Sequence, residues 1–261
     1  MRGRALALAL AGLLVAAAGA AQDFASALPP LMGDGLAFLE QGLPPGRAAW
    51  SMESSSVRWF GSSELVTGSL AVGGAWRSAR GQIGVSRTGQ GGLGWSAAAA
   101  GAGVGGVDRA VAIRACARRS VSGESGAEFG LGAWSRVGGS VRLWASAPQA
   151  WTDGEPPPLE RHLELGILWH ADAVRAWLQR SGAPAGHEGL ASDHAAGVAL
   201  AGRGLLTWIA LRDRPVRGGF GIAAGRGGLR VAMSIDSHPV LSETVRITIA
   251  WTGAAAAAEP R

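Results

Sequence analysis

A short run of the chain, Ser192-Asp193-His194, holds the three residue types of a serine-hydrolase triad. Adjacent residues of a strand point to opposite faces, so these three side chains cannot form the hydrogen-bonded relay that the chemistry needs. A serine from elsewhere in the chain would have to meet His194 at the edge of a loop. A membrane-embedded lipid hydrolase built in this way is one of the hypotheses that we keep for the function. Apart from it, the sequence predicts no catalytic residues and no enzyme.

A second group of candidate residues, His162, Glu164 and His170, shares one face of a predicted strand. His162 and Glu164 would stand about 7 Å apart on that face. A metal ion would need further ligands from neighbouring strands, and the sequence identifies none. The glycine-rich stretches 89–94 and 225–228 precede no helix, so they predict tight turns rather than phosphate-binding loops. We therefore predict no metal site and no cofactor.

The alternation of side chains places a set of charged residues on one face of the predicted strands. Inside a closed barrel that face would line the lumen, where arginines can favour the passage of anions. The same arginines can instead pair with acids across the strands and hold a filled barrel together, and we favour this pairing. The lumen-facing candidates are Arg80, Arg114, Arg142, Arg230, Arg246, Glu128, Glu164 and Asp236.

The segments that carry these residues have a hydrophobic period of two. In the last of them, Val245, Ile247 and Ile249 alternate with Arg246 and Thr248, which gives one apolar and one polar face. A length of about ten residues suits a strand tilted across a bilayer. We predict strands at 47–60, 64–76, 79–88, 91–104, 107–119, 126–136, 139–147, 160–169, 172–180, 191–201, 204–212, 216–224, 228–236 and 243–252.

The predicted connections differ in length by parity. Very short turns alternate with connections that are mostly longer, and those at 148–159, 181–190 and 237–242 are much longer. In an up-and-down meander alternate connections lie on the same side, and outer-membrane barrels have short periplasmic turns and longer external loops. The sequence therefore predicts an all-β, up-and-down antiparallel transmembrane barrel of about 14 strands (12–14) with a short N-terminal segment.

The first 46 residues differ from the rest. Arg2 and Arg4 precede an apolar run at 5–18, and the small residues Gly19-Ala20-Ala21 follow it, which is the pattern of a signal peptide. Residues 22–46 could form one short helix between proline pairs. We predict a signal peptide at 1–21, a periplasmic or plug-like segment at 22–46, the barrel at 47–252 and a C-terminal tail at 253–261.

Composition agrees with export and with a membrane. Only 16% of the 261 residues are charged, and 42 are glycine. Cys116 is the single cysteine, so no internal disulfide is available to stabilise an exported chain.

Trp76, Trp169 and Trp251 fall at strand ends on the apolar face, as in an interfacial girdle. Arg109 and Arg175 interrupt the apolar face of their predicted strands. The sequence has no basic helix that would predict nucleic-acid binding.

The whole-chain plan resembles the bacterial outer-membrane barrels related to long-chain fatty-acid transporters, including barrel components of the type IX secretion system. The resemblance rests on the signal peptide, the N-terminal segment 31–37 (Leu-Met-Gly-Asp-Gly-Leu-Ala), the strand number and the Ser-His-Pro-Val-Leu turn at 237–241. It implies a barrel in the bacterial outer membrane with the lipid bilayer as its main partner. No functional residue is carried over from it.

The predicted function is non-enzymatic: the barrel transports a small or hydrophobic solute, or serves as a membrane platform for exported proteins. The first alternative is a closed barrel whose external loops, 148–159 and 181–190, bind a partner. The second is a secreted soluble all-β domain, which would have no reason to sort its loops by parity.

Overall fold

The protein is described by a computed structural model at residues 50–76, 78–90, 93–105, 108–154, 163–182, 193–213, 216–237 and 242–253. The predicted signal peptide, the plug-like segment and the tail beyond residue 253 lie outside these residues, as do His162 and Ser192. In the described ranges no helix is both long and apolar enough to cross a bilayer.

Fourteen strands follow one another along the chain, with one short 3-10 turn, η2 (Trp59–Gly61), after the first of them. They are β1 (Trp50–Arg58), β2 (Val66–Trp76), β3 (Ala79–Gln90), β4 (Leu93–Gly105), β5 (Arg109–Ser120), β6 (Ser125–Val137), β7 (Val141–Gly154), β8 (Leu163–Ala171), β9 (Val174–Gly182), β10 (Asp193–Gly202), β11 (Leu205–Asp213), β12 (Val216–Arg226), β13 (Leu229–Asp236) and β14 (Thr244–Thr252).

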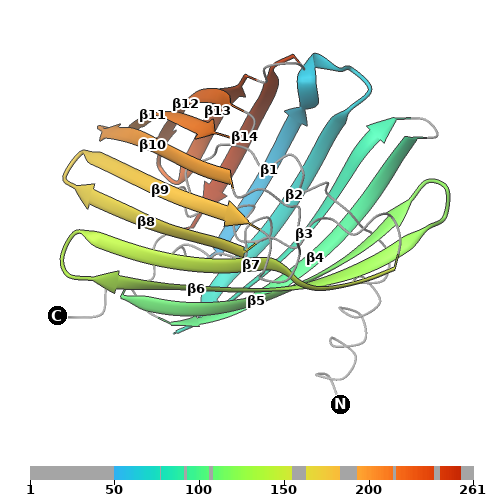
Figure 1. Ribbon diagram of the computed structural model, residues 1–261, viewed down its shortest axis with the longest axis horizontal. Helices are drawn as coiled ribbons and strands as arrows, with labels where there is room; N and C mark the ends of the chain where they lie inside the picture. Colours follow the sequence, from blue (N-terminus) through green and yellow to red (C-terminus); the bar gives the residue numbers. More distant parts are fainter. Residues whose placement is uncertain are drawn as a thin grey trace.

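Each strand pairs antiparallel with its neighbours in sequence, and β1 also pairs with β14, so the sheet closes into a barrel (Figure 1). At the seam Ser55 lies opposite Thr248, and the Thr248 hydroxyl donates a hydrogen bond of 3.3 Å to the Ser55 hydroxyl. Closure gives every strand two hydrogen-bonded neighbours and removes the open edges of the sheet. The predicted closed up-and-down barrel of fourteen strands is confirmed.

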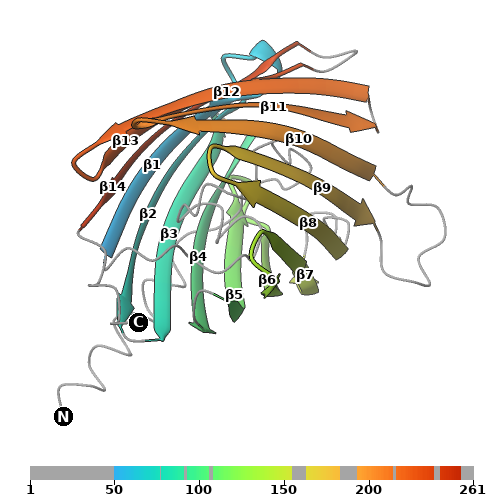
Figure 2. The same cartoon turned by 90° about the vertical axis from the view of Figure 1, so that its left-hand side faces the viewer.

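The two ends of the barrel differ in the length of their connections, and the short β8–β9 and β12–β13 turns of one end are visible in Figure 2. At the short-turn end the hairpins β2–β3, β4–β5, β6–β7, β8–β9, β10–β11 and β12–β13 turn within two or three residues. Gly227 and Gly228 both have positive φ, 62° and 89°, which the tight turn between β12 and β13 requires. The opposite end carries the longer connections after β1, β5, β7, β9 and β13, and is called the long-loop end.

The outer face of the barrel is apolar on most strands. Met233 on β13 lies between Ile222 of β12 and Ile247 of β14, and all three side chains are exposed. Leu165, Ile167 and Trp169 are likewise exposed along β8. Exposed aliphatic side chains in continuous bands are what lipid-facing strands present. Ten residues tilted by about 40° would cover roughly 25 Å along the barrel axis.

Polar and aromatic residues border this apolar band. Toward the long-loop end of β3, β4 and β5, the outward positions Arg87, Ser96 and Arg119 form one row across the strands. At the short-turn end Trp50 and Trp251 are exposed, with ring centroids 5.7 Å apart, and Trp169 is exposed on β8. The side chain of Trp76 is not among those described.

Two sequence predictions are corrected by the structure. The prediction that the strand of 139–147 ends before Pro148 is wrong, because β7 continues to Gly154. A register shift between Phe129 and Leu131 of β6 accompanies this extension and restores pairing beyond the proline. The prediction that Arg175 interrupts an apolar face is also wrong, since Arg175 shares the inward face of β9 with the buried Trp177.

Candidate functional site: the inner wall of the barrel

All eight predicted lumen-facing residues lie on the inward face of their strands, where buried and exposed positions alternate. Arg114, Glu128, Glu164 and Arg246 are buried, with 3–9% of each residue exposed. Arg80, Arg142, Arg230 and Asp236 are half-buried. Within this set, Arg114 and Glu128 form a direct ion pair. The wall is therefore charged, but its charges are spread over several strands.

The ion pair belongs to a buried cluster of three residues on β5 and β6. Arg114 Nη2 donates a hydrogen bond of 2.8 Å to Glu128 Oε1, and Arg118 Nη2 donates to Glu128 Oε2. Glu128 therefore uses both carboxylate oxygens on two arginines. Sequence analysis missed Arg118, although its spacing of four from Arg114 puts both side chains on one face of a strand. A buried carboxylate held between two guanidinium groups ties β5 to β6 inside the barrel.

A polar chain near the long-loop end joins η2, which follows β1, to the inner faces of β2 and β3. The indole Nε1 of Trp59 donates a hydrogen bond of 2.8 Å to the Thr67 hydroxyl, which is 2.7 Å from the Thr88 hydroxyl. All three residues are buried. The strand pattern alone gives no signal for this chain, because Trp59 lies in η2, past the end of β1. It stabilises the barrel next to the β1–β14 seam.

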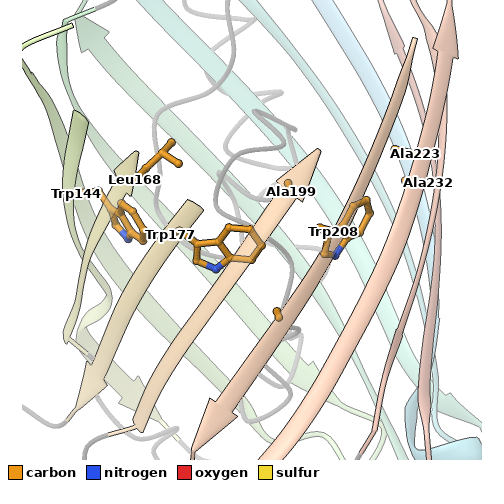
Figure 3. Close-up of a cluster of buried hydrophobic side chains, with 8 residues drawn as sticks. Trp144, Leu168, Trp177, Ala199, Trp208, Ala223 and Ala232 are labelled. Carbon is orange, nitrogen blue, oxygen red and sulfur yellow. The ribbon is translucent and has the colours of Figure 1, made fainter. Parts of the chain in front are cut away.

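An apolar patch lies on the part of the wall from β7 to β13. Its buried residues are Trp144, Leu168, Trp177, Ala199, Trp208, Ala210, Ala223 and Ala232, and Trp134 and Leu206 pack against them. Figure 3 shows Trp144, Trp177 and Trp208 in one row across the strands, with Ala199 between the last two. These tryptophans point inward, as the alternation of buried and exposed positions along their strands requires. Indole rings and methyl groups therefore line part of the wall between β7 and β13, next to inward charged residues such as Glu164 and Arg212.

Each of these indoles lies directly over a glycine of the next strand. Trp144 covers Gly166, Trp177 covers Gly197 and Trp208 covers Gly221, and in each pair the two residues are cross-strand partners. A Cβ at any of the three glycines would occupy the space of the ring. The missing side chain therefore lets each ring lie flat against the wall.

Replacing Gly221 by alanine is expected to lower the free energy of unfolding by about 1–3 kcal/mol, because the new methyl group would overlap the Trp208 ring and force it to move. Urea titration followed by near-ultraviolet circular dichroism would measure both the stability and the altered indole environment. Gly68→Ala is the matched control, since a Cβ there meets no atom within 4 Å. Equal effects of the two substitutions would contradict the flat packing of Trp208.

His194 lies on the outer rim rather than in the lumen. Its Nδ1 is 2.8 Å from Asp213 Oδ2, and the backbone N–H of His194 donates to Asp213 Oδ1 at 2.7 Å. Both side chains are nearly half exposed, at 49% and 44%. The described residues bring no serine hydroxyl into this hydrogen-bonded pair. The pair links β10 to β11 at the long-loop end.

The same wall shows no metal centre within the ranges that the structure describes, where no three His, Cys, Asp or Glu residues are grouped so as to hold an ion. Glu164 and His170 lie at opposite ends of β8. An inner wall that has both apolar and charged surfaces can bind a solute or let it pass. Arginines on such a wall attract anions, and indoles favour apolar groups.

A scan against protein-family models gives no match, and neither does a search of the curated proteins. Solved structures similar to this chain include a mutant porin of Rh. blastica at 9% identity and TM-score 0.44, covering 78% of this chain and 98% of that one. A triple mutant of Rhodopseudomonas blastica porin matches at 8% identity and TM-score 0.42, covering 79% and 99%. Similarity at this level assigns neither a pore nor a solute to this chain.

Proposed function

We propose that this chain is an integral outer-membrane barrel that lets a small or hydrophobic solute pass through its lumen. The observation that supports this most is the pairing of an apolar outer face with a charged and partly aromatic inner wall. A soluble β-sheet protein would present the reverse, with polar side chains outside and apolar side chains inside. The Trp50 and Trp251 pair at the short-turn end suits a bilayer interface.

The passage is narrow rather than wide. Arg114 and Arg246 on one side of the wall and Trp144 and Trp177 on the other are each less than 10% exposed. A wide aqueous channel, as in barrels of about sixteen or more strands, would leave such side chains in contact with water. A barrel of fourteen strands is intermediate in diameter between these wide channels and the small barrels whose interior is filled by side chains. This supports selective passage of a solute in preference to free diffusion.

Single-channel recording tests this proposal. The full chain, folded into planar lipid bilayers in potassium chloride, is expected to give discrete current steps smaller than those of a wide general pore, because the wall charges narrow the path. Heat-modifiable migration on an SDS gel verifies that the same sample holds a closed barrel. Folded protein that carries no current would remove the transport function. The function would then be one of two others: a closed barrel whose external loops bind a partner, or a membrane platform for exported proteins.

We also propose that the segment 22–46 plugs the periplasmic mouth of the barrel. Its place in the chain supports this, because it precedes β1, which begins at Trp50 at the short-turn end. Deleting 22–46 while keeping the signal peptide would raise the conductance if this segment narrows the path. The finer resemblance to fatty-acid transporters and type IX secretion barrels also stays a proposal.

A further inference from the structure

The inward face of β2 to β5 carries many residues with little or no side chain. Gln82 of β3 lies between two glycines of the neighbouring strands, and so does Ala112 of β5. Glycine inside a strand often marks a place where a ligand or another backbone comes close to the sheet. We call this surface the small-residue wall, and it is defined by Ala71, Gly73, Gln82, Gly101, Gly103 and Ala112.

The residues of the small-residue wall are nevertheless buried. Ala71 is 1% exposed, Ala112 is 3% exposed and Gln82 is 4% exposed. The glycines directly opposite Gln82 and Ala112 have no side chain with which to cover them. The wall spans four strands, about 14 Å, which is too wide for one long side chain such as Arg80 to cover. The burial therefore points to a covering element inside the lumen.

The wall between β7 and β13 needs no such element. There the indoles of Trp177 and Trp208 lie over glycines of the next strand, and Ala199 and Ala223 pack in the same cluster (Figure 3). Large side chains of the strands themselves account for the burial of the small ones. This contrast separates the small-residue wall from the rest of the lumen.

The Gln82 side chain gives an independent, polar observation. Its Oε1 and Nε2 atoms are both buried, and neither has a hydrogen-bond partner among the residues that the structure describes. An unpaired buried amide is costly, so whatever covers it should offer both a donor and an acceptor. A backbone peptide group offers an N–H and a C=O together. The Gln82 amide, with a glycine on either side, therefore fits a stretch of polypeptide backbone.

The segment that precedes β1 is in the right place to supply this backbone. Ser51, the second residue of β1, lies opposite Gly73, and Gly73 lies opposite Gln82. Residues 22–46 could span about 80 Å when extended, which is several times the width of the wall. The connections after β7 and β9 instead leave from the long-loop end, on strands that are not adjacent to this wall.

Composition favours this segment over the C-terminal tail, which also leaves the barrel beside β1. Residues 22–46 contain three acids, no arginine or histidine, and eight leucine, phenylalanine and methionine residues. The inward positions that the structure describes carry more arginines than acids, so an acidic segment complements their charge. Residues 254–261 are five alanines with one acid, one proline and one arginine. They offer neither the charge nor the apolar side chains.

From these observations we propose that residues 22–46 lie inside the barrel along the small-residue wall, and that a backbone peptide group of this segment exchanges hydrogen bonds with the Gln82 amide. The proposal rests on the proposed function, because it takes the plug from the mouth to a defined docking surface. Gln82 is about 10 Å along β3 from its first residue. A solute would then pass on the side of the lumen that carries Trp144, Trp177 and Trp208.

Alkylation of engineered cysteines tests this docking in the folded protein. In a Cys116→Ala background, Ala71→Cys places a thiol under the proposed segment. Ala223→Cys is the matched control, because Ala223 is 2% exposed but packs in the tryptophan cluster. Iodoacetamide labelling, read by mass spectrometry, should be slow at both thiols in the full chain. Deleting 22–46 should accelerate labelling of Ala71→Cys at least tenfold and leave Ala223→Cys unchanged, and deleting 254–261 should change neither.

The role of the Gln82 amide has its own test. Gln82→Leu keeps the size of the side chain but removes its donor and acceptor, so it should raise the labelling rate of Ala71→Cys severalfold. Gln179→Leu is the matched control, since Gln179 is also buried but already donates a hydrogen bond of 3.3 Å to the Ser181 hydroxyl. Equal labelling rates in the two variants would overturn the pairing of Gln82 with the segment.

If the chain without 22–46 does not show heat-modifiable migration, disulfide trapping in the full chain replaces the deletion. In the same cysteine-free background, Ala71→Cys is combined with a cysteine at Ala27, Gly33 or Ala37, and copper phenanthroline catalyses oxidation. At least one combination should cross-link fivefold more than the same cysteine does with Ala223→Cys. Absence of a cross-link in all three combinations would overturn the docking.

The remaining outcomes separate this proposal from the proposed function. Rapid labelling of Ala71→Cys in the full chain would overturn the docking, and exposure on deletion of 254–261 alone would assign the wall to the tail instead. A protected thiol in a barrel that carries no current would leave the docking standing and remove passage through the lumen. Channel current together with a reactive thiol would leave the passage standing and remove the docking.

Discussion

Replacing Glu128 by glutamine is expected to lower the free energy of unfolding of the barrel by about 3–5 kcal/mol, which is the cost of breaking a buried ion pair from one side. Arg114 and Arg118 would then face each other with no carboxylate between them. Both Arg114 and Glu128 have side chains that are only 3% exposed, so water gives little compensation. Urea titration of the folded protein in detergent micelles, followed by tryptophan fluorescence, would measure the loss.

The matched control is Glu64→Gln, which removes one carboxylate from an exposed position in the β1–β2 connection. Exposed substitutions of this kind usually change stability by less than about 0.5 kcal/mol. Adding Arg118→Gln to Glu128→Gln should recover part of the loss, because it removes one of the two opposed cations. A Glu128→Gln variant as stable as the control would show that water reaches the cluster and screens its charges.

Replacing Met233 by arginine is expected to destabilise the barrel by about 2–4 kcal/mol when it is folded in a lipid bilayer. Met233 is outward and exposed at the middle of β13, with Ile222 and Ile247 on either side. A guanidinium group there would have to leave water for the hydrocarbon layer. Denaturant titration in liposomes, with folded and unfolded fractions separated by gel migration, gives the free energy.

Two comparisons make this result specific to a membrane. Leu229→Arg places the same charge at the short-turn end of β13, near the interface, where the cost should fall to about 0–1 kcal/mol. Met233→Leu keeps the position apolar and should be nearly neutral. If Met233→Arg is as mild as Leu229→Arg, the outer face is in contact with water and the secreted soluble domain becomes the better description.

Most of the fold is predictable from this sequence because period-two alternation carries two kinds of information at once. In the last strand, Val245 to Trp251 show both that the backbone is extended and which face turns outward. The parity of connection lengths then orders the strands as a meander. Closure of β1 on β14 follows from the even strand count and from the need of every backbone group for a partner.

The parts that escaped prediction depend on contacts between strands. The continuation of β7 past Pro148 needs the register shift in β6, which a single strand's pattern cannot reveal. The pairs of Trp177 with Gly197 and Trp208 with Gly221 depend on register, so inward tryptophans were predictable but their glycine partners were not. The inward position of Arg175 was missed because Arg175 was judged from its own strand alone, whereas the structure pairs it with His170 of β8 on the face that also carries Trp177.

The hydrogen bond between Thr248 and Ser55 spans 193 positions of the chain. Its two strands are the first and the last to be synthesised, so the ring cannot be completed while any part of β14 is still missing. Contacts with such long separation in sequence form slowly, because the chain between them must be ordered first. A nascent chain would therefore have to be kept from aggregating until β14 has been made, and loss of β14 would leave β1 and β13 as open edges of the sheet.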